Sequence, residues 1–239
     1  MKSVSHFYGL GEPPSGTGTS RSWHRIGHLG DAGTHAKRGR VVILDLDGTI
    51  TFSDTLLPFL WGCFLRFPRL RPGLFLFPLH CLLFLLRCSN ATLLKQQLLT
   101  TVIGGLPVAS VDEWARQFAK RIIASRCRPQ MLDLIKRHQQ NADRLVVLTA
   151  SPSIYVRSIA EGLDISEIIA TEIEVRDGHY TGRLLSMNCA GIEKLRRIQE
   201  YLRLERNEAC IVAYGDRKSD IPVLEWADEG WLIRDRKWW

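Results

Sequence analysis

Two aspartates stand two residues apart, directly after a short apolar run, in the sequence Asp45-Leu46-Asp47-Gly48-Thr49. In an extended chain, residues two apart point to the same side, so both carboxylates should face one pocket. Gly48 permits the sharp turn that follows. For either aspartate alone, a turn after a buried strand is a sufficient explanation. Two close carboxylates repel unless a cation lies between them or one holds a proton, so the pair predicts a metal site or acid/base chemistry.

A second carboxylate pair follows another apolar run, in the sequence YGDRKSD at residues 214–220. Asp216 and Asp220 are four residues apart, which places both on one face as a helix begins. Carboxylates together with a backbone carbonyl are the ligands that Mg²⁺ prefers. If the two loops meet at one edge of a sheet, the sequence predicts a magnesium site there.

Hydroxyl groups mark the end of a further apolar run, in the sequence Thr149-Ala150-Ser151-Pro152. Ser151 is a suitable helix N-cap and Pro152 a suitable first helical residue. A hydroxyl beside a helix N-terminus can bind a phosphate group, and this makes Thr149 and Ser151 candidate phosphate-binding residues. Capping alone explains the pattern equally well.

Lys194 lies near the start of a helical pattern at residues 191–198. Ile192, Leu195 and Ile198 form the apolar stripe of this predicted helix, which leaves position 194 away from the core. From the pattern alone, a solvated lysine is therefore expected.

Apolar runs must position these polar groups, and three such runs end in polar residues and precede a helical pattern. This alternation predicts an α/β fold with a doubly wound parallel sheet, in which the carboxyl ends of the strands share one edge. The three runs are Val41–Leu44, Leu145–Leu148 and Cys210–Tyr214.

Two segments break the alternation. Residues 170–184 predict a β-hairpin around a turn at Asp177-Gly178. Residues 52–125 are too long for one crossover and mostly helical in pattern, so they should form an inserted helical cap. We therefore predict a disordered N-terminal extension, a core and a cap, at residues 1–40, at residues 41–51 with 126–239, and at residues 52–125.

The charge is basic, with a formal net charge of +7, and it is unevenly distributed. Residues 1–40 hold six basic and two acidic residues, and no aromatic-rich basic groove accompanies them. A solvated tail is therefore favoured over a nucleic-acid partner. The six cysteines form no CxxC pair, which favours small buried side chains in a reducing compartment. The N-terminus has no continuous apolar run of the secretory type, so a cytoplasmic location is expected.

The order of these features resembles the haloacid dehalogenase (HAD) superfamily over about residues 41–235: DLDGT, a strand ending at Thr149, Lys194, then GDRKSD. The resemblance implies that Asp45 is a nucleophile and Asp47 its general acid/base. It implies that Thr149 binds the transferring phosphoryl group and that Lys194 steadies both this group and the nucleophile.

The same resemblance implies Mg²⁺ as the cofactor, bound by Asp45, the Asp47 carbonyl and Asp216, with Asp220 supporting the site directly or through water. Dehalogenases of this superfamily lack an acidic residue at the position of Asp47, because halide leaves without a proton. An alkoxide needs one, so the resemblance implies phosphate ester hydrolysis.

The predicted cap is apolar and basic, since residues 55–110 contain no acidic residue. Its densest part, residues 72–86, would span about 22 Å as a helix, short of the ~30 Å hydrocarbon core, and prolines interrupt it. We therefore predict a helical hairpin in one leaflet, with residues 56–88 on an anionic membrane surface. An unusually apolar cap packed against the core is the alternative.

The position of the cap resembles the HAD subclass that contains phosphoserine phosphatase. Its apolar character, with MNCAGIEK and YGDRKSDIPVL, is similar to the phosphatidylglycerophosphatase C family. This implies a phosphorylated lipid substrate, phosphatidylglycerol phosphate, at the cytoplasmic side of the inner membrane. Two alternatives stay open: a soluble phosphatase for phosphoserine or another small metabolite, and a membrane-docked scaffold without catalysis, against which the intact carboxylates and Lys194 argue.

Overall fold

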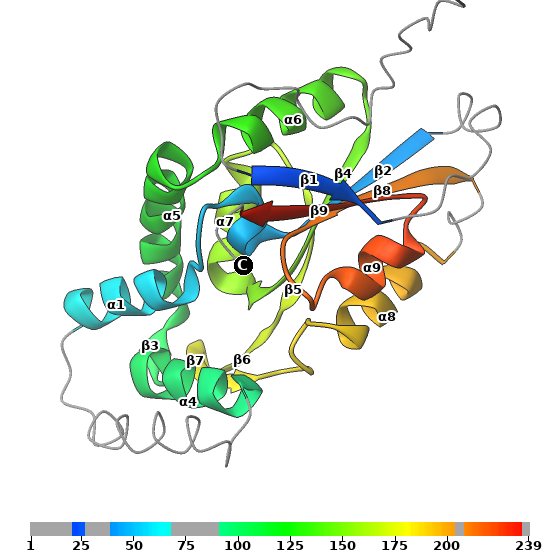
Figure 1. The fold of residues 1–239 in the computed structure, drawn as a ribbon. Coiled ribbons are helices and arrows are strands. Elements are labelled where there is room, and N and C mark those ends of the chain that lie inside the picture. Colours follow the sequence, from blue (N-terminus) through cyan, green and yellow to red (C-terminus); the bar gives the residue numbers. More distant parts are fainter. Residues whose placement is uncertain (1–20, 27–38, 68–90, 204–207, 236–239) are drawn as a thin grey trace, which may run out of the picture.

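The computed structural model describes residues 21–26, 39–67, 91–203 and 208–235. In this part of the chain, a six-stranded sheet forms the centre of the molecule (Figure 1). Five neighbouring strands are parallel, and the sixth, β1, pairs antiparallel with β9 at one edge. The parallel α/β class predicted from the sequence is confirmed. In spatial order the strands are β1 (Arg21–Arg25), β9 (Glu229–Asp235), β8 (Ala209–Gly215), β2 (Gly39–Leu44), β4 (Arg144–Pro152) and β5 (Glu167–Thr171).

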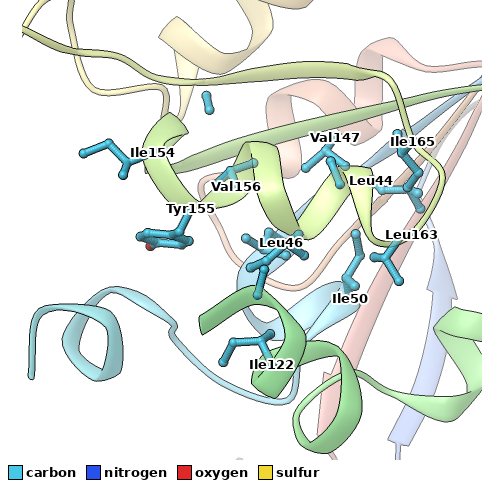
Figure 2. Close-up of a cluster of buried hydrophobic side chains, with 14 of the residues drawn as sticks. Leu44, Leu46, Ile50, Ile122, Val147, Ile154, Tyr155, Val156, Leu163 and Ile165 are labelled. Carbon is cyan, nitrogen blue, oxygen red and sulfur yellow. The ribbon is translucent and has the colours of Figure 1, made fainter. Parts of the chain in front are cut away.

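Helices cover both faces of this sheet (Figure 1). Alternate residues of β2 serve different cores: Val42 and Leu44 pack with α6 (Pro129–Gln140) and α7 (Ser153–Glu161), whereas Val41 and Ile43 pack with α8 (Ile192–Tyr201) and α9 (Ile221–Trp226). Strands buried on both faces read as continuous apolar runs. Figure 2 shows the first core, where side chains of α7 pack onto Leu44 and Val147 of the sheet.

Strand β1 corrects the prediction that residues 1–40 lack regular structure. Arg21–Arg25 pair residue by residue with Asp235–Trp231 of β9, and β2 begins at Gly39. The Trp23 ring lies 5.9 Å from the Tyr214 ring in an edge-on arrangement. Five residues with a single aromatic side chain carry too weak a period-2 pattern to predict a strand, and the sheet edge supplies the missing partner.

Deleting residues 1–38 should lower the melting temperature by roughly 5 °C relative to deletion of residues 1–20, which keeps β1. The longer deletion removes the β1 ladder and the Trp23 contact, together about 2 kcal/mol of burial and pairing. Thermal unfolding of the two truncated proteins measures the difference. Equal melting temperatures would show that β1 contributes nothing to stability.

Between β2 and β4 the described chain forms three helices, α1 (Leu56–Arg66), α4 (Ala91–Ile103) and α5 (Val108–Ser125), with the short strand β3 (Leu106–Pro107). An aromatic cluster joins α1 and α5 to the core helix α7. The Phe59 ring of α1 lies 4.6 Å from the Tyr155 ring of α7, and Phe118 of α5 lies 5.5 Å from it. Helix α5, assigned to the cap from the sequence, thus packs along the core.

The predicted hairpin is confirmed as β6 (Ile173–Arg176) and β7 (His179–Leu184), with positive φ angles at both turn residues, Asp177 (50°) and Gly178 (72°). Its partner is β3, so the hairpin completes a three-stranded sheet with the cap. Helix α4 lies directly on β7. A Cβ at Gly182 would stand 2.3 Å from the Thr100 Cα, so only glycine permits this approach.

The membrane hairpin predicted at residues 72–86 lies outside the described residues. Within the parts of the chain that the structure describes, no helix combines the length and apolar character needed to cross a membrane.

Candidate active site

Asp45 follows β2 at the carboxyl edge of the sheet, and its backbone N–H donates to the Tyr214 carbonyl of the neighbouring strand β8. The chain then turns through residues 46–50, where Gly48 has φ +90°. A Cβ at Gly48 would lie 2.0 Å from Asp216 Oδ2. Glycine therefore serves both the turn and the close approach of the Asp216 carboxylate. The guanidinium of Arg128, buried behind this loop, donates to the Gly48 carbonyl at 2.9 and 3.1 Å.

Lys194 is buried, which corrects the expectation of a solvated side chain. Its ammonium donates to Asp45 Oδ1 at 2.7 Å and to Asp220 Oδ1 at 2.6 Å. Ile192, which the apolar stripe placed in the core, is instead 71% exposed. Two carboxylates compensate the burial of the ammonium group. At the N-terminal end of α8, Lys194 therefore faces the core and Ile192 faces solvent.

Asp45, Asp216 and Asp220 form a compact acidic cluster, whose candidate ligand atoms all lie within 4.8 Å of one another. Carboxylate oxygens at the ends of two adjacent strands, with Lys194 balancing part of their charge, fit a hard divalent cation. Thr49 Oγ1 donates to Asp216 Oδ1 at 3.4 Å. Asp220 is oriented by the backbone N–H groups of Asp216 and Arg217, both of which donate to its Oδ2.

Burial raises the pKa of Asp45 to about 7, although the Lys194 ammonium opposes the shift; Asp220 and Asp47 add to it. Burial would lower the pKa of Lys194, but Asp45 and Asp220 outweigh it and raise that pKa. A cation beside these carboxylates would favour their ionised forms. A bound cation would therefore oppose the effect of burial on the pKa of Asp45.

Asp47 lies in the same pocket but has different partners. Its Oδ1 accepts from the backbone N–H of Thr55 at 2.8 Å and from the Thr55 hydroxyl at 2.7 Å, and its Oδ2 accepts from the Ser151 hydroxyl. Burial raises its pKa, while the hydrogen bonds from Ser151 and Thr55 act in the opposite direction. A carboxyl group with a raised pKa and a fixed orientation suits proton transfer.

Thr149 and Ser151 both reach the site, but Ser151 is not a helix cap. Strand β4 continues through Pro152, and α7 begins at Ser153 without a side-chain cap. The Ser151 backbone N–H donates to Thr149 Oγ1 at 3.1 Å, and its hydroxyl binds Asp47 instead. The Ser151 hydroxyl therefore binds the Asp47 carboxylate and does not cap α7.

A small cavity of about 30 Å³ lies among these groups. Asp45, Asp47, Thr149, Lys194 and Asp220 line it, as do Arg217 and the loop residues Cys189 and Ala190. Every predicted site residue except Ser151 and Asp216 therefore lines one space, and those two contact residues that do.

Sequence reasoning missed Thr55, Arg128 and Lys95. The sequence pattern places Lys95 among the basic residues of the apolar cap, yet it is buried and donates to the carbonyl of Ala150, a residue that lines the cavity. Thr55 and Arg128 bind Asp47 and its loop from 8 and 80 residues away along the chain. For Thr55 the sequence held one signal: a hydroxyl residue shortly after DLDGT. Thr55 directly precedes α1 and contacts the second aspartate, Asp47.

The parallel sheet and the carboxylates at its edge define an α/β protein with an acidic site at adjacent strand ends. A family model described as haloacid dehalogenase-like hydrolase matches residues 42–225. The chain belongs to this family of hydrolases.

Two curated relatives and one solved structure illustrate the likeness. Protein CicA of Caulobacter vibrioides (strain NA1000 / CB15N) is 30% identical over 195 residues, which cover 79% of this chain and 83% of the relative. A probable phosphatase of Mycobacterium tuberculosis is 33% identical over 129 residues, 53% of this chain and 44% of the relative. A protein with unknown function from Bordetella pertussis Tohama I has a similar fold, with a TM-score of 0.69 and 22% identity, covering 80% of this chain and 88% of that one.

Proposed function

We propose that this chain is a Mg²⁺-dependent phosphomonoesterase that forms an aspartyl-phosphate on Asp45. The observation that carries the proposal is the pairing of Asp45, held at 2.7 Å by Lys194 within the acidic cluster, with Asp47 in the same pocket. The family match and the phosphatase relative support the same chemistry.

In the proposed reaction, an Asp45 carboxylate oxygen attacks the phosphorus atom and the bond from phosphorus to the ester oxygen breaks. Asp47 gives its proton to the departing alkoxide. Water then attacks the aspartyl-phosphate, Asp47 takes a proton from it, and phosphate and free Asp45 result. Thr149 and Lys194 hold the phosphoryl oxygens through hydrogen bonds, which are strongest where negative charge accumulates.

Asp45, Asp216 and the Asp47 carbonyl would hold Mg²⁺, with Asp220 in support. The cation would neutralise charge on the phosphoryl oxygens, an effect worth several kcal/mol. Hydrolysis of p-nitrophenyl phosphate with and without a chelator tests the proposal. Activity that is indifferent to Mg²⁺ removal would contradict it.

For the substrate, we propose a lipid phosphate such as phosphatidylglycerol phosphate, at the cytoplasmic side of the inner membrane. The specific observation in favour is an apolar stripe on α1. Leu57, Trp61 and Leu65, spaced four residues apart, are 58%, 62% and 61% exposed. Arg66 ends the helix, directly before the apolar, acid-free residues 68–90. This stripe lies in the segment 56–88, for which we propose contact with an anionic membrane surface.

A water-soluble substrate, phosphoserine or another small phosphorylated metabolite, is the second candidate. It is favoured by the small volume of the site cavity, about 30 Å³, which suits a compact polar substrate. A lipid headgroup and a metabolite present the same phosphate monoester to Asp45. Membrane binding therefore distinguishes the two candidates, and the chemistry does not.

Replacing Leu57, Trp61 and Leu65 together by Ser should weaken binding to anionic vesicles by about two orders of magnitude. The stripe would lose roughly 3 kcal/mol of apolar burial in the headgroup region, and 1.4 kcal/mol is a factor of ten. Co-sedimentation with phosphatidylglycerol vesicles measures the loss. Ile192→Ser, which removes an apolar side chain from α8 that is even more exposed, at 71%, serves as control and should bind normally.

Hydrolysis of p-nitrophenyl phosphate should survive the triple change, because none of the three stripe residues lines the site cavity. If the unmutated protein does not bind anionic vesicles, the lipid substrate is wrong and the metabolite candidate stands.

A further inference from the structure

Lys95 is a cap residue whose side chain is buried against the core. It belongs to α4 and is 9% exposed. Its ammonium donates to the Ala150 carbonyl, to Asn188 Oδ1 at 2.8 Å and to Thr171 Oγ1 at 3.4 Å. These acceptors come from three separate core segments, so one cap side chain binds them to one another.

The Ala150–Ser151 peptide is held at both ends by this arrangement. Lys95 and the Thr171 hydroxyl, at 2.6 Å, donate to its carbonyl, and its N–H donates to Thr149 Oγ1 at 3.1 Å. Because a peptide is planar and its C=O and N–H point in opposite directions, fixing the carbonyl fixes the N–H. The Thr149 hydroxyl oxygen is then occupied as an acceptor, which directs its own hydrogen elsewhere.

The same peptide orients Asp47 through Ser151, whose hydroxyl donates to Asp47 Oδ2. On the other side, the Thr171 hydroxyl accepts from the Cys189 N–H at 3.2 Å, and Cys189 and Ala190 line the cavity. Lys95 thus contacts residues on two sides of the cavity, Ala150 directly and Cys189 through Thr171, but does not line the cavity itself.

We infer that Lys95 is a positioning residue: from the cap helix α4 it holds the Ala150–Ser151 peptide, and this peptide orients the Thr149 hydroxyl toward the phosphoryl group and the Asp47 carboxyl toward the leaving group. The inference rests on the proposed function. Without the Lys95 ammonium, the Ala150 carbonyl would keep the Thr171 hydroxyl as its donor, and Asn188 would lose the ammonium as its partner.

A purely structural role for Lys95 is poorly supported by energetics. Burial lowers the pKa of Lys95 to about 8, because desolvation opposes the charged form. Apolar side chains of similar volume commonly match or exceed a buried charge in stability. A position that served packing alone would be filled at least as well by methionine.

The test compares Lys95→Met with the unmutated protein on two esters, p-nitrophenyl phosphate and phenethyl phosphate. Nitrophenolate leaves without a proton, whereas the alkoxide of phenethyl phosphate needs the proton of Asp47. The variant should lose about tenfold in kcat/KM on the aryl ester, from misplacement of Thr149, and about 10²–10³-fold on the alkyl ester. Lys120→Met, on the exposed face of α5, is the matched control and should behave as the unmutated protein.

Equal losses on the two esters, or losses below twofold, would overturn the inference while leaving the phosphatase in place. If Lys95→Met does not fold, as judged by its melting temperature, Thr171→Val decides: removal of this hydroxyl from the same carbonyl should give the same difference between esters, and equal losses would again overturn it. An unmutated protein that cleaves neither ester would remove the proposed function, and the role of Lys95 with it.

Discussion

Replacing Asp45 with Asn should reduce phosphatase turnover to background without unfolding the protein. The amide cannot attack phosphorus, so no aspartyl-phosphate forms, and Thr149 and Lys194 alone cannot supply the missing nucleophile. The protein should stay folded, because the amide oxygen can still accept from the Lys194 ammonium and Asp220 still pairs with it. Initial rates with saturating Mg²⁺ measure the first effect, and thermal unfolding measures the second.

Mass spectrometry of the acid-quenched protein adds a direct readout. The unmutated chain should gain a phosphoryl group during turnover and the variant should not. Asp133→Asn, at an exposed position of α6, is the matched control and should keep full activity. Near-normal rates in Asp45→Asn would exclude the phospho-aspartate mechanism.

Replacing Asp47 with Asn should lower kcat on an alkyl phosphate by about 10²–10⁴-fold, the usual contribution of general acid/base catalysis. The amide oxygen of the new side chain can still accept hydrogen bonds from Thr55 or Ser151, so the pocket should keep its shape. The phosphoenzyme should still form with p-nitrophenyl phosphate, because that leaving group needs no proton. Its hydrolysis, which needs a base, should then become the slow step.

The raised pKa of Asp47 also predicts the direction in which the rate changes with pH. Burial raises the pKa of Asp47, so its carboxyl keeps the proton to a higher pH than an exposed aspartate would. Attack on an alkyl ester should therefore fall as pH rises through that pKa, and this alkaline limb should vanish in Asp47→Asn. A variant that retains the limb would assign the acid to another group.

The aspartates of the site could be predicted from the sequence because their relation is local. Asp45 and Asp47 share a side of one strand end, and Asp216 and Asp220 lie in one short loop that leads into a helix. The parallel sheet could be predicted because strands buried on both faces appear in the sequence as continuous apolar runs, which is also a local pattern. Lys194 needed the family resemblance, since its helical pattern pointed it toward solvent and only the distant carboxylates reverse that preference.

Lys95 and Arg128 show where local reasoning ends. Lys95 meets Ala150 from 55 residues away and Arg128 meets Gly48 from 80, so no spacing rule connects them. A lysine among leucines and phenylalanines resembles a membrane-surface residue, and only the seating of α4 shows that it faces inward. Strand β1 was missed for a related reason, because its stabilising partner β9 lies at the far end of the chain.

The small sheet β3-β7-β6 has a consequence for building chimeric proteins. Its first strand belongs to the insertion between β2 and β4, while the other two follow β5. Gly182 permits the close approach of α4 only if the hairpin and the helix match. Transplanting the specificity of this protein onto a relative would therefore require two separate grafts, and a graft of the insertion alone would leave an unpaired strand and a mismatched helix.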